Sequence, residues 1–281
     1  MMEFLEILKA IFLGIVEGIT EWLPISSTGH MILVDEFIKL NVSEEFKEMF
    51  LVVIQLGAIA AVPVLFWNRL NPFSKKKSRE ERKATWNLWV KVVVGVLPAA
   101  VIGLIFDDFF DRHFYNYIVV SIALIIYGIL FIVIEKLKRN KEYRINDVHD
   151  LTYKDAILIG SFQMLSLIPG TSRSGSTILG GMLTGVSRVA SAEFSFFMAI
   201  PVMLGASLLK IVKFAAEGIS VSGLELVILF VAMAVSFIVS LFAIKFLMDF
   251  VKRHSFTPFG IYRIILGALV IGYFLISNVV K

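Results

Sequence analysis

The chain has 281 residues, of which 58% are hydrophobic, and it carries a formal net charge of +4 at pH 7. Soluble domains are roughly 45–50% apolar, so this composition argues against a soluble fold. The sequence contains no cysteine, which excludes disulfides and thiolate metal sites. The N-terminus carries Glu3 and Glu6 in place of a basic region, so no removable signal peptide is expected.

Long apolar segments dominate the sequence. A helix needs about 20 apolar residues to cross a hydrocarbon core ~30 Å thick, and six segments approach that length. They are residues 50–67, 89–106, 114–134, 194–213, 226–248 and the segment that begins at about 259. None of them shows the alternating polarity of a membrane β-strand. The predicted fold class is therefore an all-α polytopic membrane protein with six transmembrane helices.

Two clusters of Lys and Arg orient these spans, one within residues 69–83 and the other within 136–154. Next to membrane spans, the positive-inside bias explains such clusters better than nucleic-acid binding, so both are predicted to be cytoplasmic loops and no nucleic-acid partner is expected. Residues 107–111 and the C-terminus are then outside. The acidic segment Asp107-Asp108-Phe109-Phe110-Asp111 also fits the DDxxD pattern by which prenyl synthases hold magnesium, although a short loop between spans favours a simple acidic loop.

Two apolar segments, residues 4–34 and 156–186, are left over from the six spans. Each begins as a helix and then breaks at proline, glycine and hydroxyl residues. Each must begin and end on one side of the membrane for the charge pattern to hold. We predict two re-entrant helical hairpins, whose broken backbone is tolerated only when it is buried in protein or lines a wet cavity.

The two hairpins resemble each other. The shift that places Ser26 on Ser172 also aligns Ala10, Gly14, Glu17 and Gly29 with Ala156, Gly160, Gln163 and Gly175. Duplication explains the positioned glycines and serines better than biased composition does. The prediction is one membrane domain over 1–281, with repeat one over 1–140 and repeat two over 150–281, each a hairpin plus three spans. An odd number of spans inverts the second copy, so the hairpin tips can meet near the midplane, as in inverted-repeat transporters.

The first hairpin carries two carboxylates, Glu17 and Glu21, four residues apart and so on one helix face. In a low dielectric they repel each other, so either one pKa should rise or a cation should sit between them. The alternatives are a wet helix face and a structural ion pair. Ionisable groups inside a membrane are functional by default, so both are candidate catalytic and metal-binding residues.

A hydroxyl-rich stretch follows Pro24 at the start of the next helix, where backbone N–H groups can face an anion. Ser26 or Thr28 could also be an ordinary N-cap. Ser27 is the candidate nucleophile, since Glu21 precedes it by six residues and His30 follows it by three. His30 is a candidate acid or base, and the alternative is a buried structural imidazole. The candidate substrate-binding residues of this tip are Ser26, Thr28 and Gly29.

The second tip has a stronger phosphate character, because Arg173 lies among glycines and hydroxyls just ahead of a helix. The planar fork of arginine suits bidentate phosphate binding. The candidate substrate-binding residues here are Gly170, Ser172, Ser174 and Thr177. This copy has Gln163 and Leu167 in place of the two glutamates, so repeat one supplies acid–base groups and repeat two supplies the anion clamp.

These motifs resemble one family, the bacterial undecaprenyl-diphosphate phosphatases, also called bacitracin-resistance proteins. The Glu-x-x-x-Glu element is Glu17 and Glu21, the Ser-Ser-Thr-Gly-His stretch is residues 26–30, and the Pro-Gly-x-Ser-Arg-Ser-x-x-Thr signature is residues 169–177. The closing stretch of the family is present as Phe256, Pro258, Phe259, Tyr262 and Arg263. The similarity runs from about Leu8 to the C-terminus.

The resemblance implies a lipid diphosphatase that removes the terminal phosphate of undecaprenyl diphosphate and returns the monophosphate carrier to cell-wall synthesis. It also implies a divalent cation, Mg²⁺ or Ca²⁺, and a multi-pass protein of the bacterial plasma (inner) membrane whose active site faces the extracytoplasmic side. A homodimer is left open.

Two mechanisms remain open at this point. In one, Arg173, Ser172, Ser174 and Thr177 clamp the diphosphate, a cation bridges it to Glu17 and Glu21, and Ser27 attacks with Glu21 or His30 as base. In the other, water attacks directly. The competing class of function is a transporter or flippase of a phosphorylated polyprenyl lipid, which needs an anion clamp but no nucleophile with a base beside it.

Overall fold

A computed structural model of the chain describes residues 2–114, 116–139 and 141–280, and these residues contain helices and no β-strand. Six helical stretches are long and apolar enough to cross a membrane. They are Glu44–Leu65, Arg79–Phe106, Tyr117–Lys138, Arg188–Ala216, Gly223–Arg253 and Thr257–Ile276. The all-α class and the six spans predicted from the sequence are therefore confirmed.

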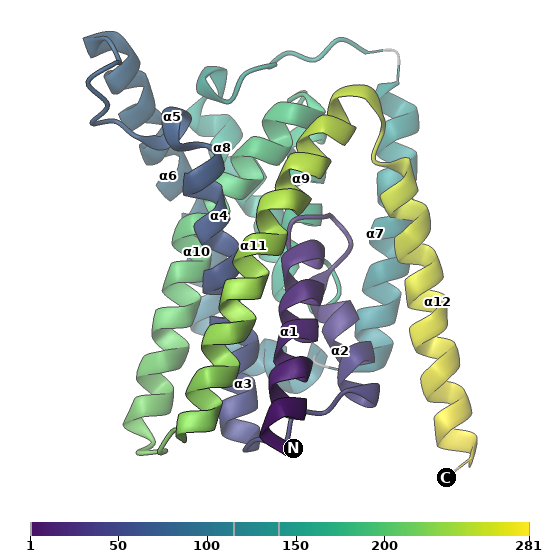
Figure 1. Cartoon of the computed structure of the whole chain (residues 1–281). Helices are drawn as coiled ribbons and strands as arrows, with labels where there is room; N and C mark the ends of the chain where they lie inside the picture. The colour runs from purple at the N-terminus through teal and green to yellow at the C-terminus, as the bar shows by residue number, and fades with distance from the viewer. Residues whose placement is uncertain (1, 115, 140, 281) are drawn as a thin grey trace.

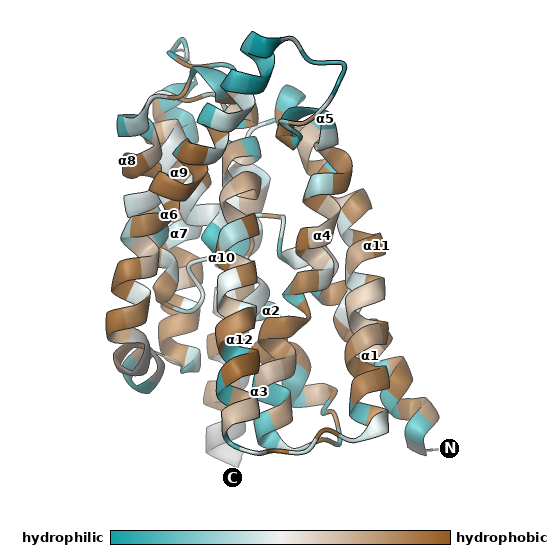
Figure 2. Cartoon of the chain, turned by 90° about the vertical axis from the view of Figure 1, so that its left-hand side faces the viewer, coloured by the Kyte–Doolittle hydropathy of each residue, from teal (hydrophilic) through white to brown (hydrophobic). Residues whose placement is uncertain are grey.

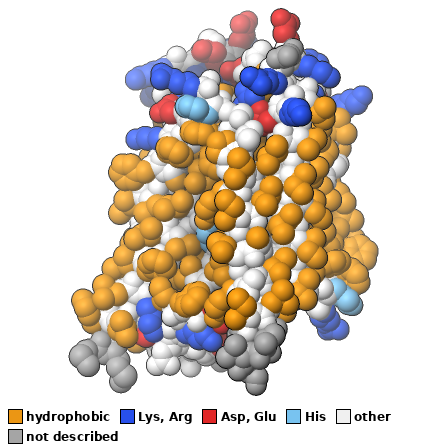
Figure 3. Space-filling view, turned by 90° about the vertical axis from the view of Figure 1, so that its right-hand side faces the viewer, with side chains coloured by type: hydrophobic (Ala, Val, Ile, Leu, Met, Phe, Trp, Pro, Cys, Tyr) orange, Lys and Arg blue, Asp and Glu red, His pale blue; other side chains and the backbone are white. Residues whose placement is uncertain are grey.

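The surface has the polarity of a membrane protein. Hydrophobic residues occupy the middle of the molecule, and hydrophilic ones concentrate at the end that carries the long loops (Figure 2). Figure 3 shows a broad band of hydrophobic side chains, with Lys, Arg, Asp and Glu gathered mainly at its upper end. A chain with six apolar spans and such a band is a multi-pass membrane protein.

In the part of the chain that the structure describes, seven helices form the six spans, because two helices together make up the first span. The first consists of α3 (Glu44–Val53) and α4 (Gln55–Leu65), and the short α5 (Trp67–Leu70) follows it. The others are α6 (Arg79–Phe114), α7 (Tyr117–Lys138), α10 (Arg188–Ala216), α11 (Gly223–Arg253) and α12 (Thr257–Val280). α12 packs along α7, α4 packs along α11, and α10 lies against α3, α4 and α6 (Figure 1).

Two helix–loop–helix units fill the space between the spans. The first is α1 (Met2–Thr20) and α2 (Ser27–Phe37). The second is α8 (Tyr153–Gln163), a 3₁₀ turn at Met164–Leu167, and α9 (Arg173–Leu183). α1 packs along α11, and α8 packs along α6, where a Cβ on Gly160 would lie 1.8 Å from the carbonyl oxygen of Gly95. Only glycine allows the two helices to approach so closely.

Each unit begins and ends at one end of the molecule. In the first, Lys9 Nζ donates to the carbonyl of Lys39 over 2.6 Å, which joins the start of α1 to the segment after α2. In the second, Arg144 pairs with Asp155 near the start of α8 and donates to the carbonyl of Thr184, after α9. In Figure 1 the first unit starts at the end where both termini are marked, and the second starts at the opposite end.

The basic loops lie together at that opposite end, as the sequence predicts (Figure 1). Arg69 ties them to the helices, with Nη1 2.9 Å from Glu193 Oε2 and Nη2 3.3 Å from Asp147 Oδ2. Burial alone would raise the pKa of Asp147, but the backbone N–H of His149 and the Arg69 guanidinium offset it, so this pKa lies below its usual range.

Several boundaries predicted from the sequence are wrong, since the second and fourth spans begin at Arg79 and Arg188 instead of residues 89 and 194. Two further differences have a clear reason. Residues 107–111 were expected to form a loop, but α6 continues as a helix to Phe114, because no glycine or proline follows Gly103 to end it. The first span begins at Glu44 instead of residue 50, because Ser43 caps α3 and the charged first turn lies outside the apolar run. The side chains of Asp107, Asp108 and Asp111 lie outside the described residues, so the DDxxD cation site, which the sequence did not favour, is not tested.

Candidate active site

The loops of the two helix–loop–helix units have the same local structure. Ser26 and Ser172 have φ values of 73° and 71°, and they are the two non-glycine residues with positive φ among those described. Each is the N-cap of the following helix: Ser26 Oγ accepts from the Gly29 N–H over 3.3 Å, and Ser172 Oγ accepts from the Gly175 N–H over 3.1 Å. The predicted N-cap in the first tip is therefore Ser26. Positive φ in a residue with a side chain is strained and is typical of functional sites.

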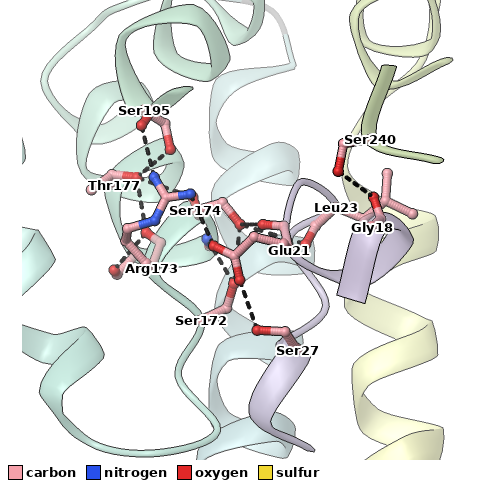
Figure 4. A network of polar contacts seen from close by, with 12 residues as sticks. Gly18, Glu21, Leu23, Ser27, Ser172, Arg173, Ser174, Thr177, Ser195 and Ser240 are labelled. Atoms are coloured by element: carbon pink, nitrogen blue, oxygen red, sulfur yellow. Dashed lines mark hydrogen bonds and ion pairs between the residues drawn. The ribbon is translucent and has the colours of Figure 1, made fainter. Parts of the chain in front are cut away.

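Glu21 joins the two tips. Ser27 Oγ donates to Glu21 Oε2 over 2.8 Å, and Arg173 Nη2 donates to Glu21 Oε1 over 3.1 Å (Figure 4). The Glu21 and Arg173 side chains are only 7% and 10% exposed. One carboxylate therefore connects the candidate nucleophile of the first tip to the arginine of the second. The sequence predicted all three residues but not the ion pair between Glu21 and Arg173.

The other terminal guanidinium nitrogen of Arg173, Nη1, also has a hydrogen-bond partner within the protein. Nη1 donates to the carbonyl of Ser195 over 2.8 Å, and the guanidinium lies 5.9 Å from the centre of the Trp22 ring. Its Nε is buried and has no hydrogen-bond partner within the described structure. Buried donors are almost always satisfied, so this nitrogen is a candidate to gain an acceptor from a ligand or water.

Glu17 and Gln163 add further unsatisfied polar atoms. They occupy matching positions of the two units and are 1% and 2% exposed. Among the described residues, neither amide atom of Gln163 has a partner, and neither has Glu17 Oε1. Leaving such groups unpaired costs about 1–3 kcal/mol each. Gln163 was noted in the sequence only as the counterpart of Glu17, and its unsatisfied amide now makes it a candidate site residue.

The hydroxyl groups of Ser174 and Thr177 are buried and form hydrogen bonds within the protein. Ser174 Oγ donates to the carbonyl of Glu21 over 3.3 Å, which is a further contact between the tips. Thr177 Oγ1 lies 2.7 Å from Ser195 Oγ and 2.9 Å from the carbonyl of Arg173 (Figure 4). Both hydroxyls therefore hold the second tip in shape, and a direct contact of either with substrate stays a prediction.

His30 is held by two groups other than Ser27. Its Nδ1 lies 2.7 Å from the carbonyl of Ser26, and its Nε2 lies 2.7 Å from the hydroxyl of Tyr262. A carbonyl only accepts, so Nδ1 carries a hydrogen, and in the neutral ring Nε2 accepts from Tyr262. Of the two bases considered for Ser27, the geometry favours Glu21. Tyr262 was visible in the sequence only as part of the closing stretch.

The two tips form the polar floor of a cavity of about 780 Å³. The predicted residues that line it are Glu21, Ser26, Ser27, Thr28, Gly170, Ser172 and Arg173. Gln55, Gln163 and Ser166 add polar groups that the sequence did not single out as site residues. Apolar side chains of α6 and α10, such as Val96, Leu104 and Leu209, form the walls. The cavity thus combines a polar floor that includes Arg173 with apolar walls.

The residues fit a divalent cation only in part. The described side chains include no group of three or more His, Asp or Glu that could hold a metal ion. Glu17 and Glu21 interact with each other, and Glu17 Oε1 lacks a partner. Mg²⁺ is commonly bound by one or two carboxylates together with substrate phosphates and water. The pair therefore suits a cation whose other ligands come from the substrate and water.

The fold and the site define an integral membrane protein with a cluster of polar and charged side chains at the foot of a cavity with apolar walls. The family model described as "Bacitracin resistance protein BacA" matches residues 10–269, and the chain belongs to this family. It is 60% identical over 276 residues to the undecaprenyl-diphosphatase of Enterococcus faecalis, covering 98% of this chain and 100% of that protein. It is 61% identical over 271 residues to the undecaprenyl-diphosphatase of Acetivibrio thermocellus, covering 96% and 98%.

Proposed function

We propose that this protein is an undecaprenyl-diphosphatase that hydrolyses undecaprenyl diphosphate to undecaprenyl phosphate and inorganic phosphate. Such a reaction recycles the lipid carrier of cell-wall synthesis and accounts for the association of the family with bacitracin resistance. The observation that carries the proposal is the chain of contacts from Ser27 through Glu21 to Arg173, at the floor of a cavity with apolar walls. Family membership and identities near 60% over nearly the whole chain support it.

The cavity suits both parts of this substrate. Arg173, Ser172 and the start of α2 offer donors to the diphosphate, and a helix N-terminus favours an anion. The walls between α6 and α10 suit the apolar polyprenyl chain. The buried Nε of Arg173 and the Gln163 amide gain partners when the diphosphate binds, so part of their desolvation cost is recovered.

The geometry supports attack by Ser27. Glu21 Oε2 receives the hydroxyl proton as Ser27 Oγ bonds to the terminal phosphorus, and the bond from that phosphorus to the bridging oxygen breaks. Undecaprenyl phosphate leaves, and water then hydrolyses the phosphoserine to release inorganic phosphate. Arg173 neutralises charge on the transferred group. Attack by a water molecule that Glu21 deprotonates is the alternative route to the same products.

A divalent cation, Mg²⁺ or Ca²⁺, is part of the proposal. Glu17 and Glu21 would hold it, and its charge would stabilise the diphosphate. Of this pair, Glu17 has an oxygen without a partner, whereas each oxygen of Glu21 also contacts Ser27 or Arg173.

We also propose that the two helix–loop–helix units are re-entrant hairpins in an inverted repeat, with repeat one over 1–140 and repeat two over 150–281. The matching caps at Ser26 and Ser172 and the opposite ends from which the units start support this arrangement. α6 and α10 both begin at the end of the molecule that carries the basic loops. The cavity is lined by later parts of these two helices, within residues 96–105 and 201–213. This favours an active site that faces the outside of a bacterial plasma membrane. The homodimer left open by the sequence and the lack of a nucleic-acid partner stay predictions.

A flippase of a phosphorylated lipid is not favoured. A carrier requires an anion site and an apolar passage, which this cavity also provides. It does not require a serine hydroxyl 2.8 Å from a buried carboxylate. A base beside a serine hydroxyl is the arrangement that activates a serine nucleophile.

The proposed function predicts phosphate release by the purified protein in detergent, where transport cannot register. The substrate is a polyprenyl diphosphate, and the matched variant is Arg173→Lys. This variant keeps the charge but loses the planar fork, and kcat is expected to fall about a hundredfold, as when one oriented donor is removed. No phosphate release by the wild-type protein contradicts the function, and wild-type turnover in Arg173→Lys contradicts the clamp.

The topology can be tested because the chain has no cysteine. Ser78→Cys lies in the first basic loop and Phe110→Cys in the acidic segment at the other end. In sealed cells, an impermeant thiol reagent is expected to label position 110 and not position 78. Labelling after the cells are opened provides the control for accessibility. The reverse pattern inverts the proposed orientation.

A further inference from the structure

Arg263 is a buried arginine whose partners are all backbone carbonyls. It lies in α12, is 0% exposed and makes no ion pair within residues 2–114, 116–139 and 141–280. Nη1 donates to the carbonyl of Pro24 over 3.1 Å, and Nη2 donates to those of Gly170 and Thr171 over 2.9 Å each. A single guanidinium thus contacts the loops of both helix–loop–helix units.

This arrangement is costly and therefore calls for a reason. A buried charge without a counterion costs at least several kcal/mol unless dipoles replace the lost water. The three carbonyls and the Tyr127 ring, whose centre is 5.6 Å from the guanidinium carbon, provide part of that replacement. An apolar side chain would fill the same space at lower cost.

Two of the three contacted carbonyls, those of Pro24 and Gly170, occupy equivalent places in the two loops. Pro24 precedes Ser26 by two residues, and Gly170 precedes Ser172 by two. Ser26 and Ser172 are the strained N-caps, and the residues directly after them are Ser27 and Arg173. The position of each reactive side chain is therefore set by a loop that Arg263 holds.

We infer that Arg263 is a positioning residue that holds the two tips in register, so that Ser27 and Arg173 act on one phosphoryl group. The inference rests on the proposed function. Arg263 is not among the residues that line the cavity, so it acts through the loops and does not touch the substrate. Its neighbour Tyr262 contacts His30, so two successive residues of α12 support the tips.

A positioning role affects kcat more than KM. Either tip can retain the diphosphate in the ground state, since each offers its own donors. The transition state needs Ser27 from one tip and Arg173 from the other at the same time. A misplacement of about 1 Å can cost about a hundredfold in rate.

The test compares Arg263→Lys and Arg263→Gln with wild type in the phosphate-release assay. Lysine keeps the charge, glutamine keeps some hydrogen bonding, and neither spans the three carbonyls. For both we expect a fall in kcat of about a hundredfold with KM within about threefold of wild type. The matched control is Arg253→Gln, which changes an exposed arginine at the end of α11 and is expected to leave both constants unchanged.

Three results would overturn the inference. Wild-type kcat in Arg263→Lys shows that charge alone suffices. A raised KM with kcat retained shows a substrate ligand. A lower melting temperature with wild-type kcat in the folded fraction shows a purely structural role. If the wild-type protein itself releases no phosphate, the proposed function fails, and this result is distinct from those three.

If neither Arg263 variant folds, a milder substitution, Tyr127→Leu, tests the positioning role of Arg263. Tyr127→Leu removes the ring beside the guanidinium and leaves Arg263 and its three carbonyls in place. It is expected to lower kcat by about tenfold with KM unchanged, because the guanidinium loses part of its support. Wild-type kcat in Tyr127→Leu counts against the inference.

Discussion

Glu21→Gln is expected to lower kcat by about a thousandfold or more, within the range for loss of a general base together with an oriented partner. Glu21 is the group that contacts both Ser27 Oγ and Arg173 Nη2. A glutamine keeps the size of the side chain but can neither take the serine proton nor balance the guanidinium charge. Phosphate release under saturating substrate measures the effect.

Glu17→Gln separates the cation from the base. Glu17 has an unpaired oxygen and no contact with Ser27, so its loss is expected to raise the Mg²⁺ concentration needed for half-maximal rate. The control is the double variant Asp107→Asn with Asp108→Asn, which is expected to keep its activity and its metal dependence. If Glu17→Gln leaves the Mg²⁺ dependence unchanged and the double variant loses its activity, the cation is held by the aspartate segment and not by Glu17.

Local patterns in the sequence were sufficient for the spans and for the residues of the tips. Apolar length alone decides whether a helix can cross a membrane, so the six spans followed directly. Ser26 was one of two possible caps predicted for the first tip, because capping depends on residues three positions away, whereas the cap at Ser172 was not predicted. The continuation of α6 beyond residue 106 was missed because a change in polarity was taken for the end of a helix.

Contacts between distant residues could not be predicted in the same way. Glu21 and Arg173 are separated by 152 positions, and no periodicity relates them. Arg263 meets Pro24 across 239 positions, and the sequence showed it only as part of the closing stretch of the family, with no indication of its partners. The predicted division of labour between the repeats stays a prediction, and the ion pair that joins Glu21 to Arg173 depends on how the tips pack.

The same limit applies to the hydroxyls. Eight serines and threonines lie in the two tips, within residues 26–28 and 171–177, and the sequence did not separate those that face the cavity from those that hold the backbone. Packing separates them: Ser27 and Ser172 line the cavity, whereas Ser174 and Thr177 hold the backbone. Burial decides this outcome, because a hydroxyl without access to solvent or substrate must find a partner in the protein.

Ser27→Ala is the second variant with a very large expected effect, a fall in kcat of at least about a thousandfold, in line with the removal of other enzymatic nucleophiles. Substrate affinity is expected to change little, because Arg173 and the second tip keep their donors. Ser26→Ala is not a suitable control, since it removes an N-cap. Thr257→Ser, a conservative change at the start of α12, serves instead and is expected to keep its turnover.

Trapping distinguishes the two routes of attack. With substrate labelled in its terminal phosphate, a rapid acid quench of the wild-type protein is expected to retain label on Ser27, since phosphoserine is stable in acid, and Ser27→Ala is expected to retain none. Substantial turnover in Ser27→Ala excludes the covalent route and assigns the attack to a water molecule that Glu21 activates. Loss of turnover without any trapped label reduces Ser27 to a donor that orients the phosphoryl group. The 2.8 Å contact with Glu21 favours the covalent route, because it places a proton acceptor on the hydroxyl before the substrate arrives.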